Sequence, residues 1–212
     1  MSGLVHIVDD DESFRTAMER RLKQAGYQVE VYPSAQDLLD RLPDGSESSC
    51  ILLDVRIPGL SGPQLQDRLG ELGSTLPIVF LTGYADVQTT VRAIKAGAED
   101  FLVKPVTSED LFAAVERALA RQRAARGQRD KLDMVRARLA RLTPREREVF
   151  ERVIRGNTNK QVGKTLGATE RTIKAHRQRV MEKLQVQTLA ELVSLGERAG
   201  ILGDISDFRP AN

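Results

Sequence analysis

The chain has 212 residues, of which 41% are hydrophobic, so it can form two small domains with apolar cores and is not a disordered polymer. Its net charge of +2 combines an acidic part, residues 1–120 with a net charge of −8, and a basic part, residues 121–212 with a net charge of +10. No apolar run approaches the roughly 18 residues that cross a bilayer, and no signal segment is present, so we expect a cytoplasmic protein without membrane contact. The single cysteine, Cys50, excludes an internal disulfide and is expected as a buried thiol on a strand.

Five short apolar segments in the acidic part predict strands, namely residues 4–8, 28–32, 50–53, 78–81 and 101–103. The segments between them, and one after residue 108, have apolar residues at helical spacing, with Ser34 and Ser108 as expected N-caps. This alternation predicts an α/β domain with a doubly wound (βα)₅ parallel sheet that helices cover on both faces. Ligands of such a sheet bind at the carboxyl ends of its strands.

Acidic residues follow two of these strands. Asp9, Asp10, Asp11 and Glu12 come after the first strand, and Asp54 ends the third. Converging carboxylates repel one another unless a cation neutralises them, and an all-oxygen site suits Mg²⁺, beside which Asp54 can attack a phosphoryl group. The structural alternative is that the first acids cap a helix and that Asp54 opens a turn.

Two further strand ends favour the phosphoryl site. Thr82 ends the fourth strand and Lys104 ends the fifth. A hydroxyl can donate to one phosphoryl oxygen, and an ammonium group supplies positive charge to another. Alone, Thr82 would more often be a helix cap and Lys104 a solvated side chain, but together with the acids they indicate one site.

Four motifs carry a family resemblance: VDDDE at residues 8–12, LDVRIPGLSG at 53–62, LTGYAD at 81–86 and VKPV at 103–106. They resemble the receiver domains of two-component response regulators, which implies strand order 2-1-3-4-5. The resemblance also implies that Asp54 is the phospho-acceptor and that Thr82, Lys104 and Phe101 are switch residues. It implies a cis peptide before Pro105. Mg²⁺ would be held by Asp10, Asp54, the backbone carbonyl of Arg56 and, through water, Asp9, with no role assigned to Asp11 or Glu12.

Residues 121–141 are rich in Arg, Ala and Gln and predict a helical linker. Leu132, Val135, Leu139 and Leu142 give it an apolar stripe, which is too short to establish a coiled coil, and Gly127 weakens the helix. We interpret it as an amphipathic connector.

The basic part then predicts a helix-turn-helix. Thr143, Pro144 and Glu146 form a capping box that opens a helix to about Arg155, which should bury Val149, Phe150 and Val153. A short helix at residues 159–166, a corner at 167–168, and a helix at 169–184 follow.

The longer helix buries Ile173, Val180 and Leu184, which leaves a cationic face of a width that fits the DNA major groove. An ordinary solvated face is the alternative, but the excess positive charge of this part favours DNA binding. The segments LTPREREVF, NKQVGKTLG and TERTIKAHRQRVMEKL resemble LuxR-type DNA-binding domains, so the whole chain resembles a regulator of the FixJ/NarL kind.

This second resemblance implies base contacts by Lys174, Ala175 and Gln178 and phosphate contacts by Arg171, Thr172 and Arg177. His176 is expected as a satisfied structural residue. A last helix at residues 188–199, with Leu189, Leu192 and Val193 apolar, would either dimerise or pack within its own domain. Residues 203–212 are expected as a tail.

These observations predict a receiver at 1–120, a helical linker at 121–141 and an all-α DNA-binding domain at 142–202. The resemblance implies a transcriptional regulator, not an enzyme. A histidine kinase would phosphorylate it, and it would then form a homodimer on double-stranded promoter DNA. It would activate transcription, with RNA polymerase as a candidate partner. One alternative is a phosphohydrolase, which would need a general acid where the sequence has Arg56. The other is a ligand-sensing DNA binder with an inert N-terminal scaffold.

Overall fold

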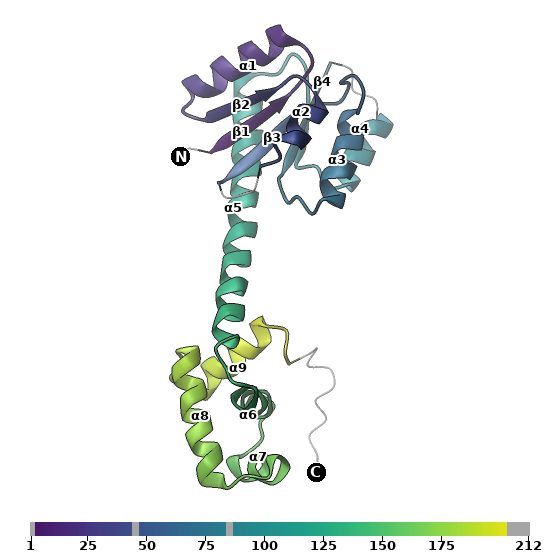
Figure 1. Ribbon diagram of the computed structural model, residues 1–212. Helices are drawn as coiled ribbons and strands as arrows, with labels where there is room; N and C mark the ends of the chain where they lie inside the picture. The colour runs from purple at the N-terminus through teal and green to yellow at the C-terminus, as the bar shows by residue number, and fades with distance from the viewer. Residues whose placement is uncertain (1–2, 44–46, 84–86, 203–212) are drawn as a thin grey trace. The chain divides into compact units, whose positions relative to one another are not determined.

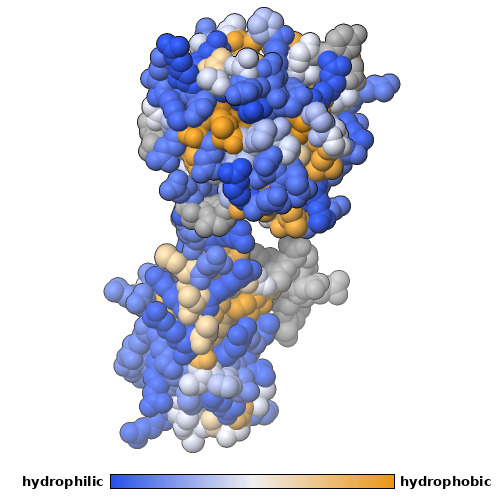
Figure 2. All heavy atoms as spheres, turned by 45° about the horizontal axis from the view of Figure 1, so that its top comes forward, coloured by the Kyte–Doolittle hydropathy of each residue, from blue (hydrophilic) through white to orange (hydrophobic). Residues whose placement is uncertain are grey.

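The computed structural model describes residues 3–43, 47–83 and 87–202, so the expected tail at 203–212 lies outside the described residues. Within these ranges the chain divides into two compact units between Arg126 and Gly127. No helix in these ranges combines the length and the apolar character needed to cross a membrane. Hydrophilic side chains cover most of the surface that Figure 2 shows.

The first unit contains a five-stranded parallel sheet of order β2-β1-β3-β4-β5, as predicted (Figure 1). The strands are β1 (Leu4–Val8), β2 (Gln28–Tyr32), β3 (Ser49–Asp54), β4 (Ile78–Thr82) and β5 (Asp100–Val103). The predicted strands lie within these bounds. Asp54 also pairs with Leu81, and Thr82 pairs with Val103. Asp54 and Thr82 are therefore the last residues of β3 and β4.

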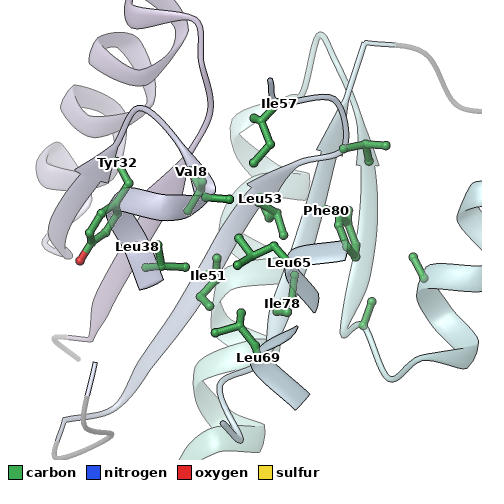
Figure 3. Close-up of a cluster of buried hydrophobic side chains, with 14 residues drawn as sticks. Val8, Tyr32, Leu38, Ile51, Leu53, Ile57, Leu65, Leu69, Ile78 and Phe80 are labelled. Carbon is green, nitrogen blue, oxygen red and sulfur yellow. The ribbon is translucent and has the colours of Figure 1, made fainter. Parts of the chain in front are cut away.

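Helices cover both faces of the sheet because successive strand residues point to opposite sides. On one face Ile51 and Leu53 pack with residues of α2 (Ala35–Asp40), α3 (Gly62–Glu71) and α4 (Val87–Lys95), in the cluster drawn in Figure 3. On the other face Cys50 and Leu52 pack with α1 (Glu12–Gln24) and α5 (Ser108–Leu139). These four of the six β3 side chains are fully buried, as expected in a central strand.

One detail of α5 differs from the sequence-based expectation, and a second agrees with it. The N-cap is Thr107, whose Oγ1 accepts a hydrogen bond from the Asp110 amide at 3.1 Å, and Ser108 is the first helical residue. The helix continues through Gly127 to Leu139, so the predicted linker is helical. The strong helix propensity of the neighbouring Arg, Ala and Gln residues outweighs the roughly 1 kcal/mol cost of one glycine.

The second unit contains α6 (Pro144–Ile154), α7 (Asn159–Leu166), α8 (Glu170–Leu184) and α9 (Leu189–Arg198). Its core includes the predicted Val149, Phe150 and Val153, and also Val135 and Leu139 from α5. The apolar stripe of the connector is therefore part of this core. In α9, Leu192 and Leu195 are buried, whereas Leu189, the first residue of the helix, is exposed.

Candidate functional site

The acidic site begins where β1 and β3 end side by side. Val8 pairs with Leu53, so Asp9 and Asp54 follow on neighbouring strands. Asp9 and Asp54 are buried, whereas Asp10 is exposed. The sheet topology thus brings the predicted acids to one edge.

Lys104 joins the two buried carboxylates. Its Nζ lies 2.5 Å from Oδ2 of Asp9 and 3.2 Å from Oδ1 of Asp54. The same Nζ lies 3.8 Å from the ring centroid of Phe14, which adds a cation–π contact. Lys104 comes directly after β5, and its amide donates to the Thr82 carbonyl at 2.7 Å, so the backbone fixes its approach to the acids.

Burial dominates the electrostatics of Asp9. It raises the pKa of this carboxyl, although hydrogen bonds from Lys104 and from the Asp11 amide lower it in part. The Asp9 carbonyl also accepts a hydrogen bond from Nη1 of Arg15 at 2.5 Å. Lys104 therefore offsets part of the cost of burying the charged form of Asp9.

The structural alternative explains part of the acidic run. Oδ1 of Asp11 accepts hydrogen bonds from the Ser13 and Phe14 amides at 2.8 and 3.0 Å and so caps α1, as that alternative predicts. Oδ2 of Asp54 accepts from the Arg56 amide at 3.1 Å, as a turn-opening aspartate does. Neither role accounts for the contacts of Lys104 with Asp9 and Asp54.

Thr82 and Phe101 lie on the adjoining strands. Thr82 is buried at the carboxyl end of β4, one residue beyond the Leu81 that pairs with Asp54. Phe101 is half-buried on β5, and its ring centroid lies 5.9 Å from that of Phe80. The peptide between Lys104 and Pro105 is cis, as the family resemblance implied.

The predicted magnesium ligands are all oxygens. Among the described residues, no three His, Cys, Asp or Glu side chains are grouped so as to hold a metal ion. The predicted set does not need three, because it has two direct carboxylates, Asp10 and Asp54, and one backbone carbonyl. Its chemistry fits Mg²⁺, and in the structure Lys104 supplies the neutralising charge to Asp54.

The second predicted site lies on α8, which begins at the cap Thr169, as predicted. Ile173, Val180 and Leu184 are buried, whereas Lys174, Ala175, Gln178, Arg171 and Thr172 are exposed and Arg177 is half-buried. Nε2 of Gln178 donates to Glu182 at 3.1 Å, and Oγ1 of Thr172 lies 2.8 Å from Oγ1 of Thr169. The predicted DNA contacts thus form one solvent-facing surface.

The turn before α8 needs glycine at two positions. Gly167 ends α7 with a left-handed φ of 63°. Gly163 lies so close to the turn that an added Cβ would be 2.6 Å from the carbonyl oxygen of Ala168. These residues set the corner between the two helices.

Two features of this unit were not predicted. Nζ of Lys183 lies 2.6 Å from Oε2 of the buried Glu146, and this hydrogen bond lowers the pKa of Glu146 to about 2. Glu146 was recognised only as a capping residue, because its partner is 37 positions away in the sequence. His176 was expected to be satisfied, but among the described residues its buried Nδ1 has no hydrogen-bond partner.

Known proteins resemble both units. The family described as response regulator receiver domain matches residues 5–116, and the family described as bacterial regulatory proteins, luxR family, matches residues 140–195. The transcriptional regulatory protein FixJ of Bradyrhizobium diazoefficiens is 40% identical over 202 residues, which cover 95% of this chain and 98% of FixJ. The tetrathionate response regulatory protein TtrR of Salmonella typhimurium is 39% identical over 194 residues, 92% of each chain.

Solved structures of response regulators also resemble this chain. The response regulator StyR has a TM-score of 0.85 and 40% identity, and the match covers 92% of this chain and 98% of StyR. Full-length FixJ from B. japonicum has a TM-score of 0.57 and 39% identity, with 95% and 98% coverage.

Proposed function

The chain belongs to the two-component response regulators of the FixJ/NarL kind, and from this premise we propose that phosphorylation of Asp54 controls its binding to promoter DNA. As a member of this family it is a transcription regulator with a LuxR-type DNA-binding domain. The observation that carries the proposal is the contact of Lys104 with both Asp9 and Asp54, because it places a fixed positive charge beside the proposed acceptor.

In the proposed reaction, a carboxylate oxygen of Asp54 bonds to the phosphorus of a histidine kinase's phosphohistidine. The P–N bond breaks, and the imidazole nitrogen leaves with the electron pair and takes up a proton. Mg²⁺, held by Asp10, Asp54 and the Arg56 carbonyl, with Asp9 bonded through water, would stabilise the charge on the transferred group. Lys104 pairs with one phosphoryl oxygen and the Thr82 hydroxyl donates to another.

The phosphoryl group adds about −1.5 to −2 charges to the site at neutral pH. Thr82 moves toward this charge, and Phe101 moves into the space beside Phe80 that the movement opens. The surface of α4, β5 and α5 changes with Phe101, because packed side chains have discrete arrangements. This surface then forms the homodimer.

Two DNA-binding domains in one dimer bind paired half-sites with higher avidity than one domain binds a single site. Lys174, Ala175 and Gln178 contact bases, and Arg171, Thr172 and Arg177 contact phosphates. We further propose that the bound dimer activates transcription by recruiting RNA polymerase and that the protein is not a turnover enzyme. In this scheme residues 1–120 receive the signal, 121–141 connect, and 142–202 bind DNA.

Asp54→Asn tests the proposal, because it removes the nucleophile and keeps the shape of the side chain. We expect the variant to gain no phosphate from acetyl phosphate with Mg²⁺, measured as intact mass, and to lose the phosphodonor-dependent increase in DNA affinity. Asp11→Asn is the matched control, since Asp11 caps α1 and is assigned no part in the chemistry. An Asp54→Asn protein that gains the same mass as the wild type would refute the assignment.

A further inference from the structure

A cavity of about 350 Å³ lies in the first unit, at the end of the sheet remote from Asp54. Ile78, the first residue of β4, is in its wall, whereas Thr82 of the phosphorylation site is the last. The other walls come from the ends of α3 and α4, the connection from α3 to β4, and the turn of α5 that carries Arg121, Gln122 and Ala125. Its volume is at the lower end of the range for small-molecule sites.

Two buried glutamines line this cavity. Gln66 is 7% exposed and Gln122 is 5% exposed. Nε2 of Gln66 donates to the Ala93 carbonyl at 3.2 Å, and this fixes the orientation of the amide, because a carbonyl oxygen cannot donate in its place. Among the residues that the structure describes, Oε1 of Gln66 and Oε1 of Gln122 have no hydrogen-bond partner.

Two buried acceptors that no protein donor reaches need donors from a molecule in the cavity, because a buried polar group without a hydrogen bond is costly. The other lining side chains do not donate to these two oxygens: Leu69, Leu76 and Ile78 are apolar, the Ser74 and Thr75 hydroxyls bond to neither oxygen, and Arg121 is paired with Glu99 at 2.8 Å. Because Arg121 and Glu99 neutralise each other, they add no net charge to the cavity. The cavity therefore combines apolar walls with two buried amide oxygens that no donor of the described residues reaches.

We propose that this cavity binds a small neutral molecule, about one ring in size, that has an apolar body and two N–H or O–H donors. The donors pair with Oε1 of Gln66 and Oε1 of Gln122, and the ring packs on Leu69, Leu76 and Ile78. The occupied cavity fixes the Arg121–Ala125 turn of α5 against α3 and α4. The protein thus has a second input that shares no residue with the phosphorylation site.

Benzamide is a suitable probe, because its NH₂ group carries two donors on an apolar ring. We expect it to bind the full-length protein with a millimolar dissociation constant, seen as ¹⁵N-amide shifts in the cavity lining. Methyl benzoate has the same ring and similar size but no donor, and should bind at least tenfold more weakly. Gln122→Leu should abolish this preference for benzamide.

Two variants complete the test. Gln128→Leu makes the same substitution on α5 outside the cavity and should leave benzamide affinity unchanged. Ala125→Phe fills the mouth from an exposed position, so it should fold and block both probes. The proposal is overturned if benzamide leaves the lining amides unshifted, if both compounds bind equally, or if Gln122→Leu keeps the wild-type preference, since water alone would then fill the cavity. None of these results bears on Asp54, so the two proposals fail independently.

Discussion

Lys104 is the residue on which the charge balance of the acidic site depends. It contacts Asp9, whose side chain is 2% exposed, and Asp54. A buried carboxylate that loses its cation keeps the cost of leaving water and loses the attraction that offsets it. The pair therefore has a measurable effect on stability besides its proposed role in phosphorylation.

We predict that Lys104→Met lowers the free energy of unfolding of the first unit by roughly 3 kcal/mol at pH 7, measured by urea denaturation. The pKa of Asp9, already raised by burial, should rise further in this variant. Since a raised carboxyl pKa means that folding favours the protonated form, the variant should regain stability as the pH falls through that pKa. Asp9→Asn in the same chain should restore stability at pH 7, and a double variant no more stable than Lys104→Met would contradict this explanation.

Glu146 gives the second unit the opposite pH dependence. Its pKa is about 2 in the folded protein and near 4.5 without its partners, because Lys183 stabilises the charged form. The stabilisation is complete above about pH 4.5 and is lost as the pH falls toward 2. We predict that Glu146→Gln increases hydrogen exchange of the α8 amides at pH 5 and that the difference from wild type shrinks at pH 2.5. Glu148→Gln, which removes an exposed pair with Arg145, should change exchange little at either pH.

At the scale of the elements, the sequence predicted most of the fold because its patterns are local. Strand positions, the Thr143 capping box and the α7–α8 corner all follow from neighbouring residues, and the structure agrees. The errors came where two local signals compete or where distant packing decides. Thr107 and Ser108 are equally good caps by composition, and Glu146 pairs with Lys183, which lies 37 positions away in the sequence.

The same distinction applies to the candidate site. The carboxyl ends of parallel strands must meet at one edge, so Asp9, Asp54, Thr82 and Lys104 could be grouped before any coordinates were known. The sequence could not show that Asp9 is the closest partner of Lys104, or that the Phe14 ring lies beneath the ammonium group. Both depend on side-chain conformations that residues far apart in the chain determine together.

Glycine substitutions in two helices should have effects of opposite sign. We predict that Gly163→Ala lowers the Tm, because the new Cβ would lie 2.6 Å from the backbone oxygen of Ala168 and the turn must shift. Gly127→Ala should raise the Tm slightly, because alanine favours the helix by about 0.5–1 kcal/mol over glycine. The added Cβ fits, since nothing lies within 4 Å of its position. Calorimetry of both variants measures this, and a decrease of equal size in both would mean that contact with Ala168 is not the cause.

At the scale of the whole molecule, the two parts have opposite net charge, −8 and +10, and separate tasks. If phosphorylation acts through dimerisation, it should raise affinity for DNA with two half-sites far more than for a single half-site, because only paired sites gain from tethering. Gel shifts on both probes, with and without phosphodonor, measure the ratio. Affinity for either probe should fall steeply with salt. An equal gain on both probes would instead indicate that the unphosphorylated receiver covers the Lys174 face.

Cys50 gives the molecule an intrinsic reporter of opening. The thiol is fully buried in the central strand, burial raises its pKa to about 12, and the sequence has no other cysteine. A thiol reagent can therefore react only when the sheet around β3 opens, so its labelling rate measures the kinetic lability of the first unit alone. The rate at which the first unit opens can be measured in this way on the native chain, without an engineered label, while phosphodonor, DNA or a small molecule is added.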